Sequence, residues 1–256
     1  MKSYRFVILL IAIITMAINS CSDDNSPGGS SNNNNNGGGS NTGSCAGGPT
    51  TVTDIDGNVY NVVSIGNQCW MKENLRTTRY KNGTVIPTPS GNDWFNTSTG
   101  ACCDPQSNPV NSSVYGKLYN WYAVANPAGL CPTGWHVPEN WEWNVLLKHI
   151  DTNADTSSVF LPNSQVAGGA MKEIGLSHWV APNSGATNST GFTALGAGYR
   201  DLDGSDYALG IAAWWWSSTG DFSIQAFPKM ILYGSAGVTG TPYSMKAGLS
   251  VRCVRD

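Results

Sequence analysis

The sequence predicts an α+β domain over residues 49–256, built mostly of short antiparallel strands with two helices and long loops. Two observations carry this prediction. The chain has only 12% charged residues but 30 glycines and 10 tryptophans, a composition typical of loop-rich domains rather than helical bundles. In addition, strand-like segments come first, helical segments follow and strand-like segments return, an order that favours a mainly antiparallel sheet.

The first strands form a predicted hairpin. Apolar and polar residues alternate over residues 51–67 on both sides of Asp56-Gly57-Asn58, which is a strong signal for a hairpin turn. A third strand is expected over residues 69–74. Residues 76–113 are rich in Gly, Pro, Asn, Ser and Thr, so we expect long loops with little regular structure there.

Helices are predicted in the middle of the domain. Residues 141–150 form the clearest one, with Pro138 just before it and Asn140 as the expected N-cap. Its apolar residues recur at i, i+3, i+4 and i+7, which places them on one face: Trp143, Leu146, Leu147 and Ile150. Residues 167–174 give a second, shorter helix. After Gly191 the pattern returns to short strands separated by glycines, at residues 192–199, 214–219, 225–233 and 249–254.

Residues 1–20 have the three parts of a secretory signal peptide. Lys2 and Arg5 give a positive start, residues 6–18 are almost entirely apolar, and small Ser20 lies at the expected cleavage position. The apolar run is short for a membrane span, although an uncleaved N-terminal anchor is the alternative. Cys21 follows directly, and this arrangement resembles the lipobox of bacterial lipoproteins. The resemblance implies that lipid on Cys21 attaches the protein to the outer membrane.

Residues 21–48 form a predicted flexible tether between lipid and domain. The segment is mostly Gly, Ser and Asn, so it cannot bury enough apolar surface to offset its ordering entropy. Its root-mean-square span would be roughly 30 Å. Asp23 and Asp24 resemble the export signal of lipoproteins displayed on the bacterial cell surface. The alternative is that they are ordinary solvated linker charges.

Charge and cysteine content restrict the partners. Removing Lys2 and Arg5 with the signal peptide reduces 14 basic residues to 12, against 17 acidic residues, for a net charge of −5. We therefore expect no nucleic-acid partner, because phosphate binding needs a clustered positive field. No CxxC or HxH pair occurs, so we expect neither a metal nor another cofactor. An even number of further cysteines in an exported chain predicts three disulfides among Cys45, Cys69, Cys102, Cys103, Cys131 and Cys253.

Six sequence strings stand out: residues 68–75 (QCWMKENL), 115–121 (YGKLYNW), 131–138 (CPTGWHVP), 198–201 (GYRD), 215–219 (WWSST) and 250–255 (SVRCVR). In this order they resemble the Fibrobacter succinogenes major paralogous (FISUMP) domain over about residues 50–256. The resemblance implies a C-type-lectin-like fold, the scaffold of formylglycine-generating enzymes and of the variable proteins of diversity-generating retroelements. It implies no single activity, because one fold hosts many different sites.

The resemblance also has consequences for individual residues. Glu139 stands where the family commonly has Ser or Thr opposite Glu142, which is why Asn140 is expected to cap the helix instead. Lectin-like folds tie the segment before the main helix to the last strand, which implies a Cys131–Cys253 disulfide. We expect two further bridges, although four cysteines permit three pairings: Cys69 with Cys103 and Cys45 with Cys102.

The sequence contains no catalytic constellation that meets the usual requirements. His136 is expected to be a structural histidine beside the helix start, and His149 and His178 have no partner at metal-ligand spacing. Copper-dependent oxidation, which related folds carry out, needs two free thiols. Cys102-Cys103 is the only close pair, and we expect both residues in disulfides. Asp201, Asp203 and Asp206 are expected in a solvated turn, with a cation site as the alternative.

Binding is the predicted function. Residues 201–214 and 221–244 lie between framework motifs and are rich in Gly, Ser, Tyr and Asp, the mixture that recognition loops favour. We expect one exposed patch containing Tyr207, Trp214, Tyr233 and Tyr243. The protein would be an adhesin-like recognition domain for a glycan or protein ligand. The alternatives are an enzyme of the formylglycine-generating type and a structural cell-surface component without a soluble ligand.

Overall fold

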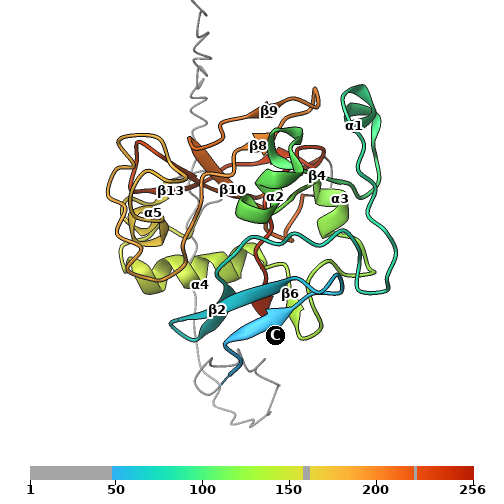
Figure 1. Ribbon diagram of the computed structural model, residues 1–256. Helices are drawn as coiled ribbons and strands as arrows, with labels where there is room; N and C mark the ends of the chain where they lie inside the picture. Colours follow the sequence, from blue (N-terminus) through green and yellow to red (C-terminus); the bar gives the residue numbers. More distant parts are fainter. Residues whose placement is uncertain (1–47, 158–161, 222–223) are drawn as a thin grey trace, which may run out of the picture. The chain divides into compact units, whose positions relative to one another are not determined.

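The computed structural model describes residues 48–157, 162–221 and 224–256. Within these ranges the chain is an α+β fold of short helices and short strands (Figure 1). Every pairing between its strands is antiparallel. The predicted fold class is therefore confirmed. The predicted signal peptide, the lipidation residue Cys21, the tether up to residue 47 and Cys45 lie outside the described residues.

One sheet joins the first and last strands of the domain. Its order is β1-β2-β3-β15-β6. The predicted hairpin forms between β1 and β2, with Gly57 at φ +83° in its turn. The last strand inserts between β3 and β6, so the sheet closes the domain on itself. The strands are β1 (Thr51–Thr53), β2 (Val59–Ile65), β3 (Gln68–Met71), β15 (Val254–Arg255) and β6 (Trp135–His136).

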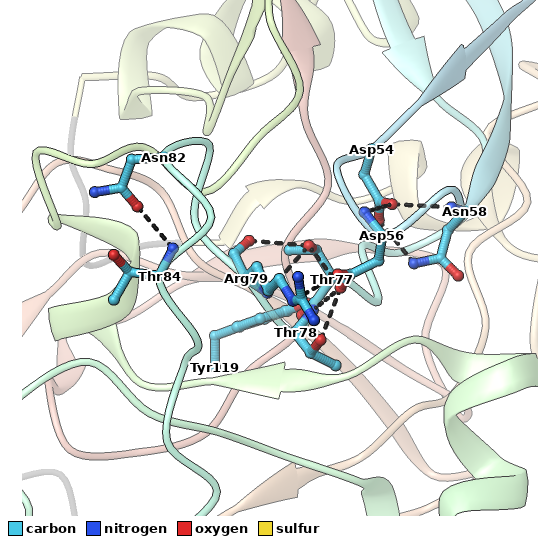
Figure 2. Close-up of polar contacts among 9 residues, drawn as sticks. All are labelled: Asp54, Asp56, Asn58, Thr77, Thr78, Arg79, Asn82, Thr84 and Tyr119. Atoms are coloured by element: carbon cyan, nitrogen blue, oxygen red, sulfur yellow. Dashed lines mark hydrogen bonds and ion pairs between the residues drawn. The ribbon is translucent and has the colours of Figure 1, made fainter.

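The β1–β2 turn is fastened to the loop that follows β3 (Figure 2). Asp56 accepts hydrogen bonds from the hydroxyls of Thr77 (3.2 Å) and Thr78 (2.8 Å), and its carboxylate lies 3.5 Å from Arg79 Nε. The hydroxyl of buried Tyr119 donates to the carbonyl of Thr77 at 2.8 Å. These contacts connect a surface turn to the core and hold the loop in one position.

A second sheet carries the C-terminal half. Its order is β10-β12-β13-β7, formed by β10 (Ala212–Trp215), β12 (Lys229–Leu232), β13 (Val238–Gly240) and β7 (Pro162–Ser164). Three two-stranded pairs complete the described strands. They are β4 (Cys102–Cys103) with β5 (Leu118–Tyr119), β8 (Tyr199–Arg200) with β9 (Asp206–Tyr207), and β11 (Gln225–Ala226) with β14 (Tyr243–Ser244).

Most predicted C-terminal strands are shorter than expected. Residues 192–198 contain isolated bridges but no strand, and the segment 225–233 divides into β11 and β12 on either side of Pro228. Proline cannot donate a ladder hydrogen bond, which explains the break. Only the end of segment 249–254 is a strand, although Leu249 and Ser250 form single bridges.

The helices also depart from the prediction of two helices separated by loops. The described residues contain five α-helices and one 3₁₀ turn: α1 (Asn92–Asn96), η1 (Pro105–Ser107), α2 (Pro109–Tyr115), α3 (Trp121–Val124), α4 (Asn140–Ile150) and α5 (Ala167–Met171). Three of them lie in or next to the segment expected to be loops. They are too short to show a helical period, so neighbouring contacts rather than their own pattern fix them.

Helix α4 is the predicted main helix, with a different cap. Glu139, not Asn140, occupies the N-cap position in extended backbone, and the Glu142 carboxylate accepts its N–H at 2.8 Å. Glu142 is the third residue of the helix, and its side chain supplies the second half of a capping box. The buried face of α4 packs on aromatic neighbours, with Trp143 4.7 Å from Trp70 and 6.1 Å from Phe192 between ring centroids.

Asn74 connects several distant segments inside the core. Its Oδ1 accepts from Trp215 Nε1 (2.8 Å) and from Arg252 Nε (3.2 Å) and Nη2 (2.9 Å). Its Nδ2 donates to the carbonyl of Tyr115 (2.8 Å) and to Ser250 Oγ (3.3 Å). Asn74 is 4% exposed and Arg252 is 1% exposed. One amide therefore holds together segments that are more than 100 residues apart.

Candidate ligand-recognition site

Four aromatic side chains form a cluster at the C-terminal half of the domain. We call Tyr199, Tyr207, Trp214 and Tyr243 the aromatic cluster. Tyr199 stacks on Tyr207 at 5.8 Å between centroids and meets the edge of Tyr243 at 6.0 Å. Trp214 lies 5.6 Å from Tyr199 and 5.3 Å from Tyr243. Three of the four residues predicted for one patch therefore come together, around a fourth that was not predicted.

Local backbone geometry explains why these rings meet. Strands β8 and β9 pair Tyr199 directly with Tyr207, and side chains opposite each other across a hairpin lie on the same face. Gly198 precedes β8 with φ +68°, and a Cβ on it would lie 2.2 Å from the carbonyl oxygen of Tyr207. Only glycine fits there. Gly198 also bridges to Ala213, which brings Trp214 alongside.

The cluster has a buried floor and an exposed outer ring. Trp214 is 9% exposed and packs in the main core, so its predicted place in an exposed patch is wrong, whereas Tyr207 is 43% exposed. Tyr199 and Tyr243 are half-buried between them. A half-exposed ring that is fixed by stacking needs little further ordering when it meets a ligand, so Tyr207 is the natural outer contact.

Two carboxylates border the rings. Tyr207 donates its hydroxyl to Asp203 Oδ2 at 3.1 Å, and Tyr243 donates to Asp201 Oδ1 at 3.1 Å. Burial and then the Asp201 charge raise the pKa of Tyr243 above its ordinary value, so its hydroxyl stays protonated. A hydrogen bond from the Ser205 backbone holds the pKa of Asp203 below its ordinary value, so that group stays anionic. The surface thus combines aromatic faces with hydrogen-bond acceptors.

One polar atom in the cluster lacks a partner. Trp214 Nε1 is buried and makes no hydrogen bond to the residues that the structure describes. A buried indole N–H usually has a partner, because leaving it unpaired costs about 1–3 kcal/mol. The unpaired donor lies within the cluster that carries the exposed Tyr207.

Tyr233 does not belong to this surface, so the prediction of a single four-residue patch is wrong on that point. It follows the end of β12, is partly buried, and packs against the second core cluster beneath α4. Its backbone N–H donates to the carbonyl of Ile211 at 2.8 Å. Tyr199 belongs to a motif that the sequence predicts to be framework. Pairing residues 199 and 207 across the Asp203-Gly204 turn signal would have found it.

Asp203 and Asp206, near the aromatic cluster, have different partners and do not form one acidic site. Asp203 lies in the β8–β9 turn, whereas Asp206 forms an ion pair with Arg200, 2.6 Å between Oδ2 and Nη2, and both side chains are largely buried. Across residues 48–157, 162–221 and 224–256, no group of three or more His, Cys, Asp or Glu side chains is placed to hold a metal ion.

One of the three predicted disulfides is confirmed, and the other two predicted pairings are wrong. Cys131 and Cys253 are bonded, with Cα atoms 6.0 Å apart. Cys102 and Cys103 are free, so the pairings Cys69–Cys103 and Cys45–Cys102 are wrong, although Cys69 itself is disulfide-bonded.

The position of β4 explains the two free thiols. Successive strand residues point to opposite faces, so Cys102 enters the main core, and Cys103 packs beside Trp94 and Leu118. Burial raises the pKa of Cys102 to about 12 and that of Cys103 further still. Both thiols are therefore held in the neutral form, whereas soft-metal ligation requires thiolates.

His136 is clamped between two carboxylates. Its Nδ1 lies 2.6 Å from Asp256 Oδ1, and its Nε2 lies 2.9 Å from both carboxylate oxygens of Glu142. Both ring nitrogens are thus occupied, as expected for a structural histidine. The hydrogen bond with Glu142, opposed by burial and aided by Asp256, raises the pKa of His136 to about 9. The clamp ties β6 to α4 and to the end of the chain.

We expect this clamp to make stability pH-dependent. Because the pKa is raised in the folded state, the contribution is complete below the unfolded value near 6.5 and disappears as the pH rises through about 9. His136 is 39% exposed, so solvent screening reduces the effect to about 1–2 kcal/mol. Urea unfolding of the parent and His136→Gln should differ at pH 6 and converge by pH 10. A constant difference would contradict the charge-based account.

No helix in the described part of the chain is long and apolar enough to cross a membrane.

The family model described as the Fibrobacter succinogenes major domain matches residues 63–255, which include all six motifs. No curated protein matches the chain. No solved structure matches it either.

Proposed function

Because the chain belongs to the Fibrobacter succinogenes major domain family, we propose that it is a recognition domain that binds a glycan or a protein through the aromatic cluster. The single observation that supports this most strongly is the stacking of half-exposed Tyr207 on Tyr199 next to Asp201 and Asp203. Rigid aromatic anchors bordered by a few polar groups are the usual composition of a recognition site.

A glycan is the ligand that this chemistry favours. The apolar face of a sugar ring stacks on an exposed aromatic side chain, and its hydroxyls donate to carboxylates such as Asp203. Tyr207 and Asp203 are already joined by a 3.1 Å hydrogen bond, so the ring and the acceptor are presented together. A preformed pair of this kind lowers the entropic cost of binding.

A combined glycan and protein array with the full-length chain tests the proposed function. Recognition predicts strong, saturable signals that compete with soluble ligand. An array without any such signal would refute recognition of the tested ligand classes and favour a structural component of the cell surface. Turnover of a ligand during the incubation would favour the enzyme alternative, against which the buried, neutral Cys102 and Cys103 thiols argue.

We further propose that Cys21 carries lipid and holds the domain at the outer membrane, facing the outside of the cell. The signal-like residues 1–20 and the small residue before Cys21 support this. Mass spectrometry of the mature protein should find an acylated N-terminal Cys21, and Cys21→Ser should leave the precursor uncleaved. Recovery of normally cleaved, lipid-free protein from membranes would refute lipidation. Protease added to intact cells tests exposure separately.

A further inference from the structure

A cleft separate from the aromatic cluster lies between the β1–β2 turn and α2. It has a volume of about 480 Å³, within the range of small-ligand sites. Its lining includes Asn58, Arg76, Asp104, Pro109, Ser113 and Lys117. We propose that this cleft binds a carboxylate-bearing sugar, with Arg76 and Lys117 holding the carboxylate. The cleft shares no residue with the aromatic cluster, so the two proposals can fail independently.

Hydrogen bonds hold the Arg76 side chain in place but occupy only two of its three guanidinium nitrogens. Its Nε donates to Asn58 Oδ1 at 3.2 Å and its Nη2 to the carbonyl of Val59 at 3.0 Å. The guanidinium lies 4.9 Å from the centroid of the Tyr60 ring. Its Nη1 makes no hydrogen bond to any described residue. An immobilised arginine with free donors is well prepared to bind a carboxylate.

Buried groups next to the cleft hold Asn58 and Arg76 in place, and Figure 2 shows the contacts between Asp54 and Asn58. Asp54 is 7% exposed and accepts from both the backbone N and the Nδ2 of Asn58, each at 2.9 Å. It also accepts the Tyr60 hydroxyl at 2.6 Å, and that hydroxyl in turn accepts the N–H of Arg76 at 3.0 Å. Asn58 and Arg76 are therefore positioned from the core, not by their mutual contact alone.

Lys117, the second cation of the cleft, forms an ion pair with the Asp104 carboxylate. Lys117 Nζ lies 2.6 Å from Asp104 Oδ1, and the Lys117 side chain is only 12% exposed. Although burial opposes it, hydrogen bonds from Lys117 and Ser112 hold the pKa of Asp104 below its ordinary value. Asp104 Oδ2 makes no hydrogen bond to the described residues. Asp104 is thus an anionic acceptor with one oxygen available.

These charges select a ligand class. Among the residues that line the cleft, Arg76 and Lys117 against Asp104 leave one excess positive charge, which matches a single carboxylate. A phosphate dianion carries twice the charge of a carboxylate, so it would meet stronger repulsion from Asp104. The free Asp104 oxygen, the Asn58 amide and the Ser113 hydroxyl can pair with sugar hydroxyls, and Pro109 offers an apolar surface to the ring. An acidic monosaccharide satisfies all of these groups together.

The test uses the full-length chain and calorimetric titration with glucuronate, galacturonate and N-acetylneuraminate. We expect saturable binding of at least one of them, with glucose and inorganic phosphate bound at least about tenfold more weakly. The absence of saturable binding by all three acidic sugars would overturn the proposal. Phosphate binding as tight as that of the best acidic sugar would also overturn it.

Variants locate the site. Arg76→Gln and Lys117→Gln should each weaken binding at least about tenfold, while Lys148→Gln on α4, outside the cleft, removes the same charge without effect. Ser113 is exposed, so Ser113→Glu should keep the fold and repel the ligand, whereas the size-matched Ser113→Gln should bind much more nearly like the parent. Thermal melts monitor folding. Equal affinity of Ser113→Glu and Ser113→Gln would refute the placement.

Discussion

Removing the Cys131–Cys253 disulfide should lower the free energy of unfolding by about 4–5 kcal/mol. The bond joins residues 122 apart, and chain-entropy estimates for a loop of this length give that figure, as an upper value if the unfolded chain is compact. Both cysteines are buried, with exposures of 1% and 0%. The bond also fixes the segment before β6 to that before β15, which are neighbours in the first sheet.

Urea unfolding of the Cys131→Ala/Cys253→Ala variant, followed by tryptophan fluorescence, measures this loss. Cys103→Ala is the matched control, because it removes a buried sulfur without removing a crosslink, and it should cost only about 1 kcal/mol. A double variant within about 1 kcal/mol of the parent would show that the crosslink contributes little to stability.

Replacing Asn74 by Ala should cost about 3–5 kcal/mol. The change leaves Trp215 Nε1 without its 2.8 Å acceptor and removes the Oδ1 that pairs with two nitrogens of Arg252. Arg252 is 1% exposed and has no carboxylate partner among the described residues, so its charge depends on neutral acceptors and on stacking with Phe192 and Trp215. An uncompensated buried charge is strongly destabilising.

Asn140→Ala provides the matched control for this prediction. The Oδ1 of Asn140 is buried without a hydrogen-bond partner in the described structure, so losing that side chain should change stability by less than about 0.5 kcal/mol. Both variants are compared with the parent by urea unfolding at pH 7. Equal effects of Asn74→Ala and Asn140→Ala would contradict the role of Asn74 as the connection between motifs.

Local patterns predicted the parts of the fold that local interactions decide. Alternation around Asp56-Gly57-Asn58 gave the β1–β2 hairpin, and helical spacing gave α4. The Cys131–Cys253 bond followed from the family resemblance and not from spacing. The short helical pieces before residue 116 were not predicted because pieces of three to seven residues carry no readable period and depend on tertiary contacts.

Burial could not be predicted from motif membership. Trp141 lies next to a family motif but is 48% exposed, whereas Trp94 and Trp179, which lie outside the motifs, are 1% and 2% exposed. Which face a tryptophan presents depends on how distant segments pack. The same dependence separated Tyr233 from the other predicted site residues and placed Tyr199 at the centre of the aromatic cluster.

The affinity of Tyr207→Ala for the strongest ligand from the array tests the recognition surface most directly. Tyr207 is the most exposed ring of the cluster, so its loss should weaken binding by at least ~1 kcal/mol, about fivefold or more, without changing the melting temperature much. Tyr233→Ala, outside the cluster, should bind like the parent. If Tyr207→Ala binds like the parent while Tyr233→Ala loses affinity, the ligand surface does not lie at the aromatic cluster.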